Sequence, residues 1–208
     1  MFGTGSGALL IPVFQAGERE EIGMHDVAQT LGSTRGRRPE VSIRPVSPRD
    51  GGRLRRMFSR LSGRSIYQRF HMPYPRVPEW VVALFADVDG GQGKALAAMV
   101  GDEIVGHALY VRSDHGHDAE MAVLVEDGWQ SGGVGRLLVW ELARSAVGRG
   151  IETFCGEVLG ENHRALGLLT AVFPGTRYAM RDGVYHVRMP LRAPDPAYKL
   201  AETARRAA

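Results

Sequence analysis

Hydrophobic positions along this chain follow two periods, one typical of β-strands and the other typical of α-helices. Apolar stretches of strand length occupy residues 41–44, 94–100, 103–111, 118–125, 151–159, 178–180 and 184–189. Between them, apolar residues three or four positions apart predict helices at Leu54–Leu61, Trp80–Phe85, Val134–Ala146 and in a segment that ends near Val172. Both kinds of element are therefore expected along the chain.

The same spacing predicts which helical side chains form each apolar face. The expected faces are Leu54, Met57, Phe58 and Leu61; then Trp80, Val81, Leu84 and Phe85; then Val134, Leu138, Leu142 and Ala146 with Leu137 alongside. Three local signals predict helix ends: a capping box at Ser47-Pro48-Arg49-Asp50, an N-cap at Asn162 and a C-cap at Gly150.

Composition divides the chain into one domain and two flanking segments. Residues 1–40 are rich in Gly, Ser, Thr and Arg and read as a flexible extension, in which residues 18–31 could form a short helix. Residues 41–191 are expected to fold as a single domain, and residues 192–208 as a charged tail. The 208 residues, 44% of them hydrophobic, are sufficient for one globular domain.

Charge and cysteine usage narrow the class of protein. The net charge of +3 is too small to predict nucleic-acid binding, and the apolar run 8–14 is too short to span a membrane. A single cysteine, Cys155, excludes an internal disulfide and suits a reducing compartment, so we expect a cytoplasmic protein. The oligomeric state, including a homodimer, is left open.

A glycine-rich turn follows the strand that ends at Val125. Gly132, Gly133 and Gly135 open the helix of Val134–Ala146. Such a turn leaves several backbone N–H groups pointing at one place, and the helix dipole adds about half a positive charge there. The turn is therefore either a tight strand-to-helix connection or a phosphate site. It is not a P-loop, because no Lys-Ser or Lys-Thr follows the last glycine, and it lacks the Gly-x-Gly-x-x-Gly of dinucleotide-binding folds.

The segment Gln130-Ser131-Gly132-Gly133-Val134-Gly135 resembles the Gln/Arg-x-x-Gly-x-Gly/Ala signature of the GNAT superfamily of acetyl-CoA-dependent N-acetyltransferases. The resemblance covers about residues 41–191. It implies a fold of the α/β class (α+β type), the acyl-CoA N-acyltransferase fold, which is a mixed and mainly antiparallel sheet with helices on both faces. It also implies that the coenzyme A pyrophosphate is held by Gln130, Ser131, Gly132, Gly133, Val134, Gly135 and Arg136.

A second segment, Leu61 to Phe70, resembles the Leu-Ser-x-x-Ser-x-Tyr-x-Arg-Phe stretch of Pat-type bacterial protein-lysine acetyltransferases. In that family the segment borders the acceptor groove, so the resemblance favours a protein lysine as acceptor. By periodicity alone, Ile66, Tyr67 and Phe70 are core or groove-wall residues.

Glu120 is an acid within the apolar strand 118–125, where it shares a face with Ala122 and Leu124. It is either an exposed acid near a strand end or a general base. A lysine with a pKa of about 10.4 is neutral in only about one molecule in a few thousand at pH 7, so acetyl transfer benefits from a base. The resemblance implies that Glu120, in its Ala-Glu-x-Ala context, is this base; Glu157 is a weaker candidate.

The resemblance also implies how the coenzyme arm is bound. The strand 118–125 is expected to separate from its neighbour, so that main-chain groups of Val123 and Val125 pair with the pantetheine. The Leu124 N–H would face the thioester oxygen, and Asn162 would bond the arm as well as cap its helix. One residue expected from the resemblance is absent: Leu168 to Pro174 contains no tyrosine. No general acid is therefore assigned, and Tyr178 is named only as a nearby tyrosine.

Other readings stay open. The turn Asp114–Asp118 carries two histidines and two aspartates, but we expect solvated turn residues and no metal. Cys155 could form an acetyl-enzyme, but a buried small hydrophobe is favoured. The favoured function is acetylation of a protein lysine by direct transfer. The alternatives are acetylation of a small amine, such as an antibiotic or polyamine, and a non-catalytic acyl-CoA sensor.

Overall fold

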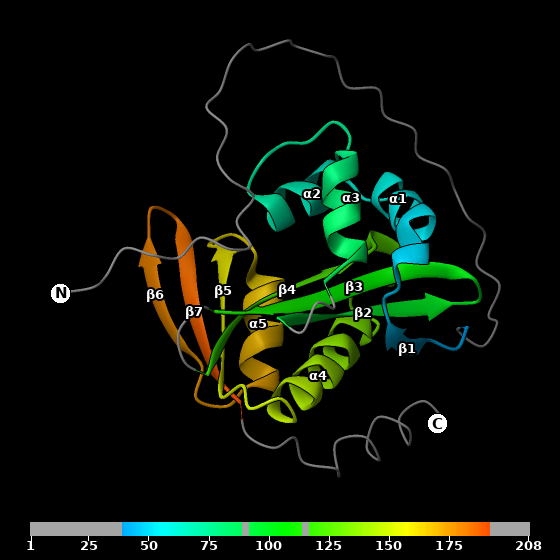
Figure 1. The fold of residues 1–208 in the computed structure, drawn as a ribbon. Coiled ribbons are helices and arrows are strands. Elements are labelled where there is room, and N and C mark those ends of the chain that lie inside the picture. The colour runs from blue at the N-terminus through cyan, green and yellow to red at the C-terminus, as the bar shows by residue number, and fades with distance from the viewer. Residues whose placement is uncertain (1–38, 89–91, 114–116, 192–208) are drawn as a thin grey trace.

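The computed structural model describes residues 39–88, 92–113 and 117–191. In these residues a seven-stranded sheet has the order β1-β2-β3-β4-β5-β7-β6 (Figure 1). The extension 1–38, with its candidate helix at 18–31, and the tail 192–208 lie outside the described residues. The strands are β1 Ser42–Pro45, β2 Gly93–Val100, β3 Glu103–Arg112, β4 Asp118–Val125, β5 Thr153–Leu159, β6 Arg177–Arg181 and β7 Val184–Pro190.

Helices cover both faces of the sheet. On one side lie α1 (Gly51–Ser59), α2 (Gly63–Phe70) and α3 (Glu79–Ala86), and on the other lie α4 (Val134–Val147) and α5 (His163–Val172) (Figure 1). Two 3₁₀ turns, η1 (Pro48–Asp50) and η2 (Asp127–Trp129), precede α1 and the loop to α4. This arrangement confirms the mixed α/β fold with helices on both faces. In the part of the chain that is described, no helix is long and apolar enough to cross a bilayer.

The sheet is antiparallel except where β4 meets β5. These two strands run parallel and pair only at Asp118, Ala119 and Glu120, which lie opposite Thr153, Phe154 and Cys155. Both strands then continue, β4 to Val125 and β5 to Leu159, without further pairing between them. The sheet therefore contains an internal cleft that begins directly after Glu120.

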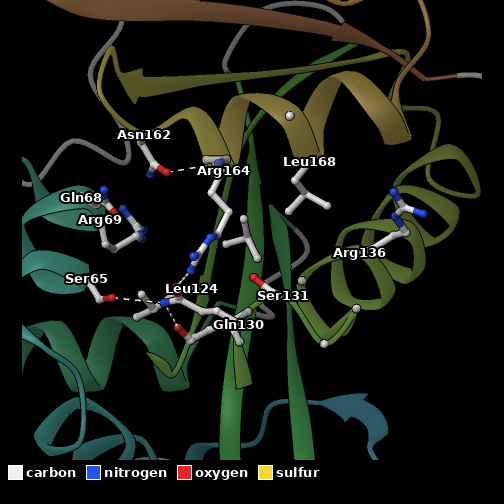
Figure 2. A pocket seen from close by; sticks show the side chains of 17 residues that line it. Ser65, Gln68, Arg69, Leu124, Gln130, Ser131, Arg136, Asn162, Arg164 and Leu168 are labelled. Atoms are coloured by element: carbon white, nitrogen blue, oxygen red, sulfur yellow. Dashed lines mark hydrogen bonds between the residues drawn. The ribbon is translucent and has the colours of Figure 1, made fainter. Parts of the chain in front are cut away.

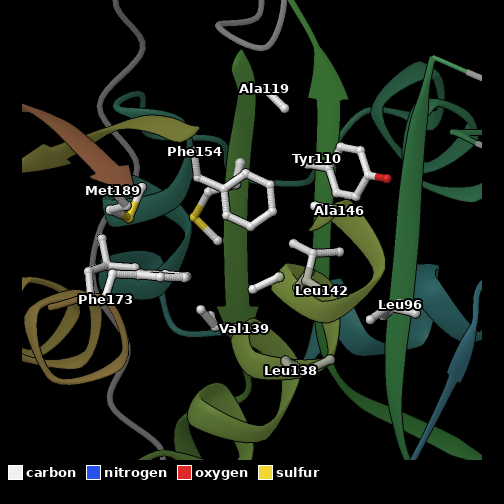
Figure 3. Packing of buried hydrophobic residues seen from close by; sticks show 14 of the residues in the cluster. Leu96, Tyr110, Ala119, Leu138, Val139, Leu142, Ala146, Phe154, Phe173 and Met189 are labelled. Carbon is white, nitrogen blue, oxygen red and sulfur yellow. The ribbon is translucent and has the colours of Figure 1, made fainter. Parts of the chain in front are cut away.

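Two apolar cores hold the layers together. In the first, α4 packs on the sheet through Val134, Leu138, Leu142 and Ala146, each at most 2% exposed, as their spacing predicts (Figure 3). In the second, Leu54, Met57, Phe58 and Leu61 bury the inner face of α1 and its C-terminal turn, also as predicted. Full burial of a side chain of this size contributes about 1.5–3 kcal/mol, so these two helices are fixed firmly against the sheet.

Two local predictions are wrong. In α3 the buried side chains are Val81, Val82, Phe85 and Ala86, whereas Trp80 and Leu84 are about half exposed. The helix is apolar on nearly every side, so periodicity cannot mark its inner face. The helix α4 ends at Val147 with Gly148 as its C-cap, and Gly150, at φ 76°, lies in the turn beyond.

The predicted caps at Ser47 and Asn162 are confirmed. The capping-box residue Asp50 is 2% exposed and has a further role. Its carboxylate accepts two hydrogen bonds of 2.7 Å from Arg44, one from the Ser47 amide and one from Arg53. The hydrogen bonds from Arg44 lower the pKa of Asp50 to about 2. An ion pair of this kind joins β1 to the start of α1.

Candidate active site

The loop between η2 and α4 forms a cluster of backbone donors. Ser131 and Gly133 adopt positive φ angles of 60° and 87°, which turn the chain sharply into the helix. Among the described residues, none accepts a hydrogen bond from the backbone amides of residues 131–136. These amides lie at the N-terminus of α4, where the helix dipole is positive. The geometry is that of an anion site, and a diphosphate is a suitable ligand.

A cavity of about 630 Å³ opens next to this loop (Figure 2). Its walls come from α2, β4, the loop and α5, so it runs into the cleft between β4 and β5. Val134 is absent from its lining because its side chain is buried in the α4 core, so only its main chain can serve the anion site. The lining includes the other predicted binding residues: Val123, Leu124, Val125, Gln130, Ser131, Gly132, Gly133, Gly135, Arg136 and Asn162.

The edge of β4 that faces the cleft can be assigned from its ladder with β3. The amide of Glu126 donates to the Val105 carbonyl, and that of Ser113 to the Asp118 carbonyl, so the even-numbered residues of β4 bond to β3. Main-chain groups alternate in direction along a strand. Those of Val123 and Val125 therefore face the cleft, as expected. The Leu124 amide points to β3 instead, and this geometry is at odds with its expected position at a thioester.

Glu120 lies in a second, smaller cavity of about 90 Å³. This cavity shares part of its wall with the large one, through Gln68, Arg69, Val123, Asn162 and Ala165. Glu120 is half-buried there, at the last pair between β4 and β5. Glu157, the weaker candidate base, lines the same cavity and is paired with His186 at 3.2 Å. The fold thus brings both candidate bases to the inner end of the cleft.

Arg69 belongs to both cavities and was not predicted as a site residue. Its guanidinium lies 5.2 Å from the ring centres of both Phe70 and Phe85. Part of the Arg69 side chain is accessible because it borders the two cavities, but its guanidinium is surrounded by protein and largely desolvated. Desolvation lowers the pKa of Arg69 to about 10, against the attraction of Glu120. Arg69 therefore remains a cation at neutral pH.

Side chains of α2 are tied to the loop by one hydrogen-bond network. The Asp127 carboxylate accepts from the Ser62 amide at 3.0 Å and from the hydroxyls of Ser62 and Ser65 at 2.8 and 2.9 Å. Gln130 then donates to Ser65 at 3.2 Å and to the Val125 carbonyl at 2.9 Å. The Leu61 to Phe70 segment thus combines a core face with two serines that position α2 against the loop.

Arg164 is a further residue that sequence reasoning missed. It extends from α5 across the large cavity, and its guanidinium donates to the Gln130 side chain (Figure 2). The cation therefore lies beside the anion site. Asn162, at the start of the same helix, accepts from the Ala165 amide at 3.1 Å and lines both cavities.

The remaining candidates are placed away from the cavities. Tyr178 bonds to Thr170 on α5 and lines neither one. Cys155 is only half-buried, not fully buried as expected; desolvation raises the pKa of its thiol, which does not favour a nucleophile. No metal-binding cluster of His, Cys, Asp or Glu occurs in the described residues, and residues 114–116 of the histidine turn are outside them.

A sheet that opens beside a helix N-terminus is an arrangement that suits an extended ligand carrying phosphate groups. Residues 61–172 match the acetyltransferase (GNAT) family. The chain belongs to this family of acetyl-CoA-dependent acetyltransferases.

Solved structures agree with this assignment. The chain is similar to the GNAT domain of S. lividans PAT, with 31% identity, a TM-score of 0.67 and coverage of 72% of this chain and 89% of that one. It is also similar to an acetyltransferase from Thermus thermophilus, with 25% identity, a TM-score of 0.56 and coverage of 73% and 97%. The fold alone is shared with yncA from Salmonella typhimurium, a putative acetyltransferase solved with acetyl-CoA, at 18% identity, a TM-score of 0.59 and coverage of 75% and 98%.

Proposed function

We propose that this protein transfers the acetyl group of acetyl-CoA directly to a lysine side chain of a protein, with Glu120 as general base. The observation that carries the proposal is the position of Glu120. It lies where the β4–β5 pairing ends, in a small cavity that shares its wall with the large one. A donor in the large cavity and an acceptor in the small one would meet beside this carboxylate.

The large cavity fits the coenzyme by its donors. The amides of residues 131–136 would hold the diphosphate, and the Arg164 cation beside them would add a charge-assisted contact. The main-chain groups of Val123 and Val125 that face the cleft would pair with the amides of the pantetheine arm, in the manner of an added strand. Asn162 stands at the other wall and can contribute its side-chain amide.

Acetyl-CoA supplies an activated acyl group, and the chain supplies a base and a donor. Glu120 would remove the proton from the attacking amine, directly or through water, which is worth about 10² to 10⁴ in rate. The Val123 amide takes the place expected for Leu124 as the donor to the thioester oxygen, because its direction is towards the cleft. Such a preorganised donor contributes about 3 kcal/mol. No residue of the chain is assigned as acid to the leaving thiolate.

Two features support a protein lysine as acceptor. The Leu61 to Phe70 segment resembles that of Pat-type enzymes, and the S. lividans PAT domain is 31% identical. The small cavity, at about 90 Å³, has room for the end of an aminoalkyl chain. Acetylation of a small amine is the second candidate, because a polyamine presents the same aminoalkyl end. The non-catalytic sensor is the third, since the family tyrosine is missing.

One comparison tests these candidates. Purified protein is incubated with labelled acetyl-CoA and either a mixture of cell proteins or a panel of small amines that includes spermidine and kanamycin. We expect label on protein lysines, and at least a tenfold loss of turnover in Glu120→Gln with little change in acetyl-CoA affinity. Turnover of the small amines alone would favour the second candidate, and micromolar coenzyme binding without any turnover would favour the sensor. Wild-type turnover of Glu120→Gln across pH 6 to 9 would remove Glu120 from the mechanism.

A further inference from the structure

The small cavity brings together several charged and titratable side chains. It is lined by two carboxylates, Glu120 from β4 and Glu157 from β5. Arg69 and His71, at the end of α2, also line it. His107 on β3 interacts electrostatically with Arg69, and His186 on β7 contacts Glu157.

Two carboxylates that share a small cavity repel each other, which disfavours the ionised form of both. Glu120 cannot act as a base while it is protonated. The proposed function therefore requires a positive charge in the cavity that favours the ionised form of Glu120. The neutral histidine side chains do not provide one: desolvation lowers the pKa of both His71 and His107, the latter to about 3.

Arg69 has the position and the charge for this role. Its guanidinium borders both cavities and is held over the faces of Phe70 and Phe85, so packing fixes it in the wall that the two cavities share. Its charge interacts favourably with Glu120. It also acts on its neighbours, because it contributes to the lowered pKa of His71 and of His107, after desolvation.

The second carboxylate has a different partner. Glu157 is paired with His186 at the side of the cavity formed by β7. His186 is about half exposed, so water screens its interaction with Glu157. Glu157 thus has a neighbour of its own in His186, whereas the charge of Arg69 acts on Glu120.

We propose that Arg69 is a positioning residue that keeps the Glu120 carboxylate ionised in the cavity it shares with Glu157. This inference rests on the proposed function for its purpose, but its physical content concerns only the charge of Glu120. Arg69 acts through Glu120 and need not touch the acceptor.

The test is a direct titration of Glu120. Full-length protein is labelled at the glutamate side-chain carboxyl with ¹³C, and the Glu120 signal is assigned by its loss in Glu120→Gln. In Arg69→Gln we expect the midpoint of the Glu120 titration to rise by about 1 to 2 pH units, the range for loss of a neighbouring arginine. Arg69→Lys should keep most of the wild-type midpoint, and a second change, Glu157→Gln, should bring the midpoint of Arg69→Gln back down.

Arg64→Gln is the matched control, because Arg64 is an exposed arginine on the same helix and lines neither cavity. Its Glu120 titration should coincide with that of the wild type. An Arg69→Gln curve that also coincides with the wild-type curve overturns the proposal. If Arg69→Gln does not fold, Arg69→Met takes its place, because methionine can fill the space beside Phe70 and Phe85 without a charge. A midpoint raised by about 1 to 2 pH units in Arg69→Met supports the proposal, and a wild-type midpoint overturns it.

Kinetics separate this proposal from the general-base proposal. With acetyl-CoA and poly-L-lysine as substrates, Arg69→Gln should be about tenfold slower than wild type at pH 6.5 and should recover as the pH rises to 9. A loss that is equal at every pH contradicts the inference about Arg69 alone. Full activity of Glu120→Gln contradicts the proposed function, whatever the titration of Glu120 shows.

Discussion

Replacement of Asp127 by alanine tests how α2 is held against the coenzyme loop. The Asp127 carboxylate accepts three hydrogen bonds from the first turn of α2, two of them from Ser62 and one from Ser65. The alanine variant removes all three acceptor contacts without changing any residue that lines either cavity. Gln68 and Arg69 lie one turn further along α2 and line the small cavity, so a loosening of this helix would also disturb the acceptor side of the site.

The expected loss of stability follows from these three contacts. A hydrogen bond to a charged group contributes about 1.5–3 kcal/mol when it is sheltered. Here Asp127 and Ser62 are exposed and only the Ser65 contact is partly buried, so water replaces much of what is lost. We therefore expect Asp127→Ala to lower the free energy of unfolding by about 2 kcal/mol, or the melting temperature by about 4–8 °C. Asp127→Asn, which keeps one acceptor oxygen, should lose about half as much.

The stability difference should also depend on pH. Desolvation acts to raise the pKa of Asp127, but the hydrogen bonds from Ser62 and Ser65 outweigh it, so the pKa lies below 3.8. Stability from a carboxylate with a lowered pKa is present above the unfolded-state pKa and is lost as the pH falls through the folded-state value. Urea unfolding of wild type and Asp127→Ala at pH 7 and at pH 3.5 should therefore show a smaller difference at the lower pH.

Steady-state kinetics complete this test. We expect Asp127→Ala to raise the KM for the acceptor more than the KM for acetyl-CoA, because α2 borders the small cavity. A variant as stable as wild type at pH 7, or a stability difference that is the same at both pH values, would refute the reasoning. The same conclusion would follow if only the KM for acetyl-CoA changed.

Three further predictions concern the scaffold and the coenzyme site. Asp50→Asn should lower the free energy of unfolding by about 2 kcal/mol at pH 7. The stability difference between wild type and variant should shrink as the pH falls from about 3.8 towards 2, and urea unfolding at pH 7 and pH 3 measures it. Arg164→Ala should weaken acetyl-CoA binding about tenfold, as expected for the loss of one charge-assisted contact, and calorimetry measures this. Arg144→Ala, on the exposed side of α4, should bind acetyl-CoA as the wild type does. Equal affinities of Arg164→Ala and wild type would exclude Arg164 from the anion site. Gly133→Ala places a Cβ at φ 87°, so it should lower the free energy of unfolding by about 1–2 kcal/mol and weaken coenzyme binding. Gly63→Ala, where a Cβ meets no other atom within 4 Å, should change neither the stability nor the binding. Thermal shift with and without acetyl-CoA measures both effects.

Much of the scaffold could be predicted from the sequence, because burial follows periodicity where polar residues alternate with apolar ones. The α1 and α4 faces are correct for this reason, as are the caps at Ser47 and Asn162, which rest on local hydrogen bonds. The glycine turn could be located as well, since its chemistry is carried by the backbone of adjacent residues.

The parts that could not be predicted depend on how distant segments meet. A charged residue in an amphipathic helix reads as solvated, so Arg69 and Arg164 gave no sign that they border a cavity. The direction of the Leu124 amide depends on the register with β3, which a resemblance to other sequences does not contain. The separation of β4 from β5 was expected only from the family resemblance, because neither strand differs in pattern from one that is fully paired.

The short β4–β5 pairing has a mechanical consequence. It joins two blades of sheet, β1 to β4 on one side and β5 to β7 on the other, by a seam only three residue pairs long. If the angle between these two parts of the sheet changed, the rotation would be centred on this seam. The width of the cleft would then change most at the end far from the seam. Because Glu120 lies at the seam, its carboxylate would hardly move while the cleft adjusts its width to a bound ligand.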